Sequence, residues 1–117
     1  MATTEITRYL EVNGERVGLD PEGYLVELAA WSPAVAEALA AEEGRELSAA
    51  HWEVIEVLRD FYARFETSPA MRPLVKAVAQ ALGSDKGNSL YLMRLFPESP
   101  PKVAARLAGL PKPANCL

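Results

Sequence analysis

The sequence contains one cysteine, Cys116, and one histidine, His51. One cysteine cannot form an intramolecular disulfide, and one cysteine with one histidine cannot supply the ligands of a structural zinc site. We therefore predict no resident metal and no other cofactor. The sequence also has no pattern typical of a catalytic triad or of a pair of catalytic carboxylates, so it does not predict a self-contained active site.

Long apolar runs are missing as well. The most apolar segment, residues 28–41, is interrupted by Ser32, Pro33 and Glu37 and falls far short of the roughly twenty apolar residues that span a bilayer. The first fifteen residues have no basic start followed by an apolar stretch, so no signal peptide is predicted. We expect a cytoplasmic protein that does not interact with a membrane.

Charge is distributed unevenly over the 117 residues, a length that suits one domain. Residues 1–66 carry five Lys/Arg and fourteen Asp/Glu, a net −9, whereas residues 67–117 carry seven and two, a net +5. This asymmetry indicates a basic surface that attracts an anionic partner, nucleic acid included. Two differently charged solvated faces with no functional role are an equally good explanation.

The N-terminal segment 7–19 is predicted to form a β-hairpin. Residues 7–12 alternate as in a strand, residues 15–19 do so again, and Asn13-Gly14 lies between them. Asn-Gly is the pair preferred by a two-residue type I′ turn, because both central residues adopt positive φ.

Residues 32–109 are predicted to form a bundle of about five helices. Three Ser-Pro pairs each place a capping hydroxyl before a proline at the first helical position; they are Ser32-Pro33, Ser68-Pro69 and Ser99-Pro100. Glycines suited to end helices stand at positions 44, 83 and 109. The central helix begins after Ser48, and an apolar stripe repeats along it at helical spacing: Trp52, Ile55, Leu58, Phe61, Tyr62 and Phe65. Residues 1–109 are therefore expected to form one mainly α-helical domain with the hairpin attached.

Residues 110–117 differ from the bundle in composition. Pro111 and Pro113 fix φ and remove backbone donors, which excludes a helix or a central strand and favours an extended segment. A chain terminus is also mobile by default. We expect a flexible C-terminal arm that carries Cys116 near its end.

Cys116 is the strongest candidate for a reactive group. A thiolate on a mobile arm can enter the active site of another protein and attack a persulfide sulfur there. Nearby cations favour the thiolate, and Lys112, Arg94 and Arg106 are candidates for this electrostatic support if the arm folds back. Without further information, a lone cysteine near a chain end is more often without function.

Other candidate sites are weaker. The loop 83–89 contains glycines, a lysine and serines but lacks the order of a phosphate-binding loop, and it follows a helix rather than a strand. A surface or capping role is expected for His51, at the start of the central helix. Trp31, Trp52 and Tyr91 are expected to be core aromatics rather than platforms for stacked bases.

Several ordered blocks resemble the DsrC/TusE family of sulfur-relay proteins, and they span nearly the whole chain. The blocks are Glu22-Gly23-Tyr24-Leu25, His51-Trp52-Glu53-Val54, Arg59-Asp60-Phe61-Tyr62, Thr67-Ser68-Pro69, Lys86-Gly87-Asn88-Ser89, Leu95-Phe96-Pro97, and Gly109-Leu110-Pro111-Lys112-Pro113 followed by Cys116. The resemblance implies an orthogonal helical bundle with an N-terminal hairpin and a helix-turn-helix-like portion.

The resemblance also implies that Cys116 carries persulfide sulfur. Members of the DsrC type have a second cysteine eleven residues upstream, where this chain has Ala105. A lone thiol has no internal partner to release its sulfur, so the resemblance is to the TusE-like, single-cysteine branch. That branch implies an upstream persulfide-donating complex and a downstream acceptor, the enzyme that forms 2-thiouridine in tRNA.

The sequence is compatible with three alternatives to a carrier for tRNA thiolation. A single-cysteine relative of DsrC can serve sulfur oxidation or dissimilatory sulfur metabolism instead. A nucleic-acid-binding regulator would use the helix from Pro69 as its reader, with Arg72 and Lys76 exposed. An adaptor would dock its arm into a partner and need no thiol. Within the carrier hypothesis, Arg72, Lys76 and Lys86 are candidate contacts to a partner or to tRNA.

Overall fold

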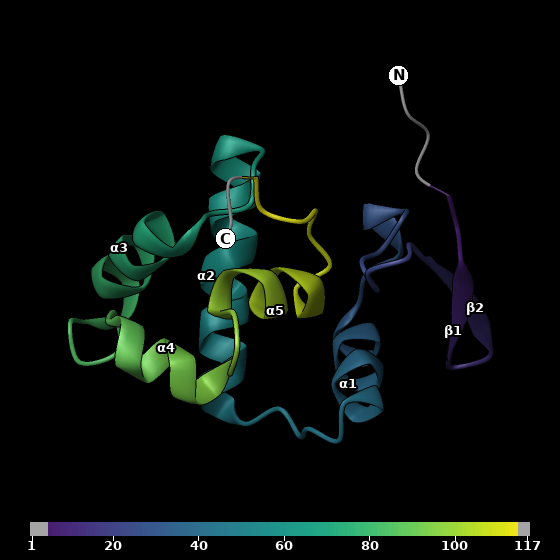
Figure 1. The fold of residues 1–117 in the computed structure, drawn as a ribbon, viewed down its shortest axis with the longest axis horizontal. Helices are drawn as coiled ribbons and strands as arrows, with labels where there is room; N and C mark the ends of the chain where they lie inside the picture. The colour runs from purple at the N-terminus through teal and green to yellow at the C-terminus, as the bar shows by residue number, and fades with distance from the viewer. Residues whose placement is uncertain (1–4, 115–117) are drawn as a thin grey trace.

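A computed structural model describes residues 5–114 of the chain and shows a helical bundle with a hairpin at one end (Figure 1). Its elements are β1 (Arg8–Val12), β2 (Glu15–Leu19), the 3-10 helix η1 (Leu28–Ala30), α1 (Pro33–Glu42), α2 (Ala49–Phe65), α3 (Met71–Leu82), α4 (Ser89–Leu95) and α5 (Pro100–Leu107). The five α-helices and the hairpin confirm the predicted fold class. None of the helices in this part of the chain is long and apolar enough to cross a membrane.

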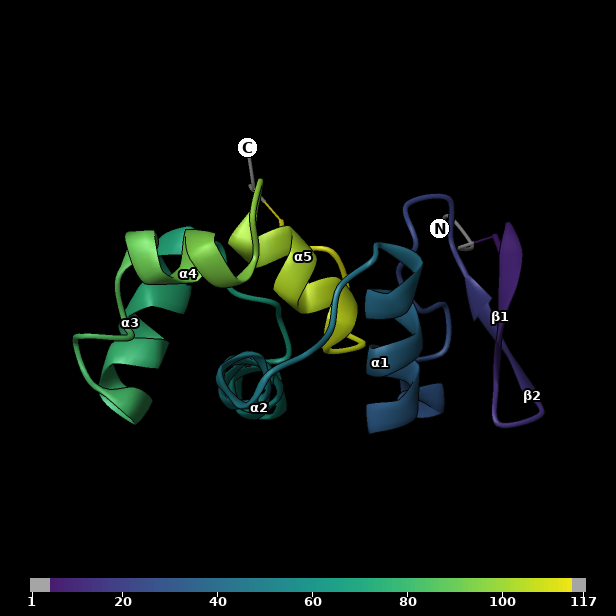
Figure 2. The same ribbon diagram turned by 90° about the horizontal axis from the view of Figure 1, so that it is seen from below.

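The hairpin forms as the Asn-Gly pair predicts. β1 and β2 are antiparallel with Leu10 opposite Val17, and both turn residues have positive φ, 51° at Asn13 and 82° at Gly14. The buried face, which includes Leu10 and Val17, packs the hairpin on the outer side of α1 (Figure 2). The register of the hairpin is therefore set by the turn residues and by its one apolar face.

The helices cross one another rather than run parallel. α5 lies across the middle of α2, with α3 and α4 on one side of this crossing and α1 on the other (Figures 1 and 2). Phe96, Ile55 and Leu58 are among the largest fully buried side chains at the centre. The arrangement places the end of α5, from which the C-terminal arm departs, between α2 and α1.

Most of the predicted helix starts are confirmed. The hydroxyl of Ser32 accepts from the backbone of Val35, with Pro33 at the first position of α1. At the start of α2, the Ser48 hydroxyl accepts from the backbone of His51, and the ring of His51 accepts from the backbone N–H of Ser48 in return. The capping role expected for His51 is therefore confirmed.

One predicted helix start is wrong. The helix after Ser68-Pro69 begins at Met71, with Ala70 as its N-cap and no side-chain cap. The Ser68 hydroxyl does not cap α3, because it donates to the carbonyl of Pro111 at 2.6 Å. A long-range contact with the start of the arm thus replaces the local cap that the sequence suggests.

Candidate functional site

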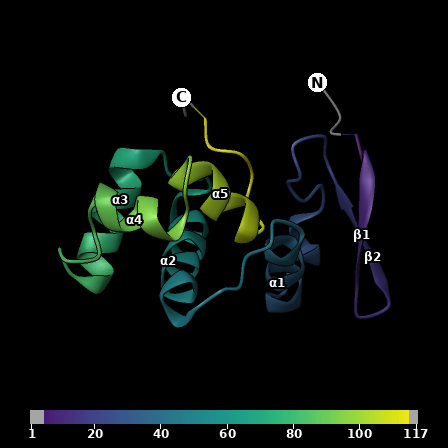
Figure 3. The same cartoon turned by 60° about the horizontal axis from the view of Figure 1, so that its bottom comes forward.

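The segment that leads to Cys116 forms the candidate site. Cys116 itself lies outside the described residues, which end at Ala114. The structure describes how the chain leaves α5 and which side chains contact the residues at that point. Figure 3 shows this segment rising from the end of α5 that faces α1.

Two side chains bind the last carbonyls of α5. Trp31 Nε1 donates to the carbonyl of Leu107 at 2.8 Å, and a guanidinium nitrogen of Arg59 donates to the carbonyl of Ala108 at 2.6 Å. The Arg59 guanidinium also lies over the Trp31 ring, 3.9 Å from its centroid. Carbonyls at the end of a helix have no intrahelical partner, so Trp31 and Arg59 together satisfy two of them.

Gly109 turns the chain out of the helix. Its φ is +74°, and its N–H bonds to the carbonyl of Arg106 while the N–H of Leu110 bonds to that of Ala105, the pattern of a Schellman motif. A Cβ at this position would lie 2.2 Å from a ring carbon of Trp31. Glycine is therefore required here both by backbone conformation and by the closeness of the indole.

The next residues remain attached to the body. Leu110 is 3% exposed and Pro113 is buried. The carbonyl of Pro111 accepts the hydrogen bond from Ser68, and Lys112 Nζ lies 2.8 Å from the carboxylate of Glu22. The described part of the arm is thus anchored on the bundle, while the predicted flexibility of residues 110–117 as a whole remains a prediction.

We call Trp31, Arg59, Ser68 and Gly109 the arm mount. They come from the end of η1, from α2, from the α2–α3 connection and from the end of α5. Burial lowers the pKa of the Arg59 guanidinium, because a cation in a partly desolvated place loses hydration. Elements far apart in sequence therefore converge on the few residues where the arm begins.

The three cations proposed to support the thiolate do not form one group. Lys112 pairs with Glu22. Arg106 pairs with Glu43, the residue that follows α1, and desolvation lowers the pKa of Arg106. Arg94 is exposed on α4. Their role beside Cys116 remains a prediction.

The candidate partner contacts lie on α3 and on the loop that follows it. Arg72 and Lys76 are exposed on α3, one turn apart. Lys86 is occupied by an ion pair with Glu53 at 2.8 Å, and this hydrogen bond raises the pKa of Lys86. The first two cations are therefore displayed outward, whereas the third also links the α3–α4 loop to α2.

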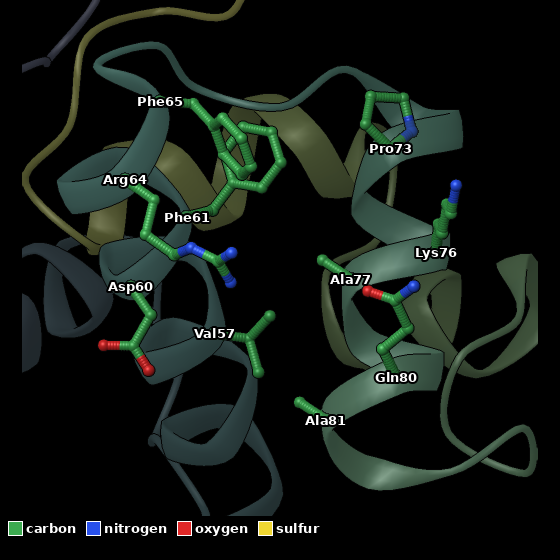
Figure 4. Close-up of a pocket in the computed structure, with 10 residues that line it drawn as sticks. All are labelled: Val57, Asp60, Phe61, Arg64, Phe65, Pro73, Lys76, Ala77, Gln80 and Ala81. Carbon is green, nitrogen blue, oxygen red and sulfur yellow. The ribbon is translucent and has the colours of Figure 1, made fainter.

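A groove of about 550 Å³ lies between α2 and α3 (Figure 4). Its lining residues are Val57, Asp60, Phe61, Arg64, Phe65, Pro73, Lys76, Ala77, Gln80 and Ala81. The groove has an apolar floor with charged rims but neither a thiol nor an imidazole among these residues. Among the described residues there is also no group of three or more potential metal ligands.

Known proteins match this chain over most of its length. A family model described as "DsrC like protein" matches residues 11–117. The chain belongs to this DsrC-like family. Sulfurtransferase TusE of Salmonella paratyphi A is 57% identical over 104 residues, which cover 89% of this chain and 95% of the relative. Sulfurtransferase TusE of Sodalis glossinidius is 56% identical over 108 residues, covering 92% and 100%.

Solved structures of the DsrC-like family have the same fold. DsrC of Allochromatium vinosum, determined by NMR, superposes with a TM-score of 0.86 at 46% identity, covering 94% of this chain and 98% of that one. The oxidized DsrC of Archaeoglobus fulgidus, the gamma-subunit of the dissimilatory sulfite reductase, gives 0.82 at 39% identity, covering 93% and 99%. The orthogonal bundle implied by the resemblance is confirmed.

Gly109 ends a helix as predicted, whereas Trp31, Arg59 and Ser68 were not predicted to hold the arm. Trp31 was expected to be a core aromatic, yet it is half-buried and its indole nitrogen points to the end of α5. No role was predicted for Arg59, which belongs to one of the blocks that resemble the DsrC/TusE family. The signal for Arg59 was its position between Leu58 and Tyr62 on the apolar stripe of α2, where an arginine needs a polar partner.

Proposed function

We propose that this DsrC-like protein is a sulfur carrier that accepts persulfide sulfur on Cys116 and passes it on for the formation of 2-thiouridine in tRNA. The single observation that carries the proposal is the relatedness, at 56–57% identity over most of the chain, to proteins named Sulfurtransferase TusE. The chemistry of the sequence supports it, because Cys116 is the only thiol. The alternative role, in dissimilatory sulfur metabolism, has weaker support, because the DsrC proteins of known structure are 46% and 39% identical to this chain.

The proposed step is a sulfur exchange without net oxidation. The Cys116 thiolate attacks the outer sulfur of a donor's cysteine persulfide, so that a new S–S bond forms at Cys116 while the donor's S–S bond breaks. The donor leaves as a thiolate, and the proton on the transferred sulfur exchanges with solvent. In the second transfer Cys116 is the donor: the acceptor's thiolate attacks the outer sulfur of the Cys116 persulfide, and Cys116 leaves as a thiolate. Neither transfer needs an external oxidant or reductant.

The partners are an upstream protein complex that bears a persulfide and a downstream acceptor acting on tRNA, all in the cytoplasm. Lys112, Arg94 and Arg106 are proposed to favour the thiolate in the complex, since cations lower a thiol pKa. Arg72 and Lys76 are proposed to contact a partner or tRNA, because they are exposed on α3. Lys86 would join them only after its ion pair with Glu53 opens.

Omission from a reconstituted relay tests the function. A desulfurase, the upstream relay proteins, the 2-thiouridylase and tRNA are incubated with radioactive cysteine sulfur, with and without this protein. We expect label in tRNA to rise by at least about tenfold on addition, because the carrier replaces slow chance encounters by a guided transfer. Equal labelling in both reactions would exclude tRNA thiolation as the function, and dissimilatory sulfur metabolism would then be the function to test.

A second prediction concerns the missing upstream thiol. Cys116 is the only cysteine, so it has no internal partner, and oxidation should give only a dimer or a mixed disulfide. The position of the upstream thiol is taken by Ala105, which is fully buried on α5. Ala105→Cys supplies such a partner, and oxidation should then give a monomeric disulfide, provided that the two Cα atoms approach to about 4.4–6.8 Å. Non-reducing electrophoresis and peptide mass mapping distinguish the products. A shortened monomer from the wild-type protein would contradict the single-thiol chemistry.

A further inference from the structure

We propose that Arg59, Trp31 and Ser68 are positioning residues that set the direction in which the arm leaves the bundle, and through it the rate at which Cys116 enters a partner's active site. This inference rests on the proposed carrier function. None of the three is proposed to touch the transferred sulfur. They act through the carbonyls of Leu107, Ala108 and Pro111.

Side chains from different parts of the fold hold the start of the arm. Three carbonyls within five residues each accept a side-chain hydrogen bond, at 2.8, 2.6 and 2.6 Å. The donors come from three separate parts of the fold, so the start of the arm is fixed from several directions. Leu107 and Ala108 are fully buried, so water does not reach their carbonyls, and the direction of the chain after α5 is tied to the side chains that satisfy them.

Arg59 loses hydration at the end of α5. Its guanidinium is held against the Trp31 ring and is partly desolvated, which lowers its pKa. A neutral donor would satisfy the Ala108 carbonyl without this loss of hydration. The planar guanidinium, however, fixes both the indole plane and the carbonyl in one geometry, and this geometry defines where Gly109 turns the chain.

Prolines stiffen the start of the arm. Pro111 and Pro113 restrict the backbone of the arm, so its direction is set mainly at its base. The chain after α5 keeps to the body as far as Pro113, which is buried, and the three carbonyls held by the mount all precede that residue. Loosening the mount should therefore misdirect the thiol without changing its chemistry.

The experiment compares partner-dependent and partner-independent reactions of Cys116. Arg59→Met, Trp31→Phe and Ser68→Ala each remove a donor to the arm, while Arg64→Met is the matched control that removes an exposed arginine from the same helix. The measured quantities are kcat/KM for persulfide transfer from the upstream donor, the rate of alkylation by iodoacetamide, and Tm. All rates are taken well below the Tm of the least stable variant.

We expect each mount variant to lower kcat/KM for transfer by about five- to tenfold, the factor that corresponds to one net hydrogen bond, while alkylation stays within about twofold of wild type. Arg59→Lys should recover part of the loss, since it retains a cationic donor. The Arg64→Met control should transfer at the wild-type rate. Transfer that is unchanged in all three mount variants, or that falls only in step with alkylation, contradicts the proposal.

A distance measurement gives a readout that a purely stabilising role would not alter. A spin label on Cys116 and a second on Glu56→Cys, an exposed position of α2, report the distribution of arm positions. We expect the distribution to broaden or shift in Arg59→Met and to stay unchanged in Arg64→Met. An unchanged distribution in Arg59→Met overturns the positioning role. The proposed carrier function has its own contradicting result, which is that Cys116 of the wild-type protein accepts no sulfur at all.

Discussion

Cys116→Ser should abolish sulfur transfer by this protein, lowering labelled sulfur in tRNA by about tenfold or more, to the level of the reconstituted relay from which the protein is omitted. A serine hydroxyl is not ionised near neutral pH and is a poor nucleophile towards a persulfide, whereas a cysteine thiolate is a strong one. Serine is close to cysteine in size, so Tm should stay near that of the wild-type protein. Labelling that continues normally with folded Cys116→Ser would mean that the protein is an adaptor.

Gly109→Ala should be among the most destabilising single changes in the chain. A Cβ at this position meets the Trp31 ring at 2.2 Å, and the residue has φ of +74°. The conformational penalty and the overpacking together amount to roughly 3 kcal/mol, which corresponds to a fall in Tm of roughly 10–15 °C for a domain of this size. Thermal unfolding followed by circular dichroism measures it.

Gly44→Ala is the matched control. Gly44 has nearly the same φ, +72°, but nothing lies within 4 Å of its added Cβ. It should lose only the conformational part, about 1–2 kcal/mol. Equal losses at the two positions would show that the contact with Trp31 does not constrain the arm's departure from α5.

Local sequence signals predicted the features that depend on neighbouring residues. Asn13-Gly14 fixed the hairpin turn, Ser32 and Ser48 fixed helix starts, and the apolar stripe of α2 marked the central helix. Each of these depends on contacts within one or two turns of chain. The family resemblance then placed them in one fold.

Apart from Gly109, which was predicted to end a helix, the arm mount was not predicted, because its contacts join residues that are far apart in sequence. Ser68 looked like a helix cap, and only the folded chain shows that Pro111, more than forty positions away, accepts its hydrogen bond. Likewise, the pairing of Lys112 with Glu22 depends on how the arm crosses the body. Periodicity and capping rules describe local structure and carry no information on such pairs.

The most direct test of the carrier mechanism is the mass of the intact protein after incubation with a persulfide-loaded donor. The account predicts addition of one sulfur, about 32 Da, located on the peptide that contains Cys116 and removed by a thiol reductant. Cys116→Ser under the same conditions should gain no mass. A wild-type protein that remains unmodified while the relay delivers sulfur to tRNA would contradict the claim that Cys116 carries it.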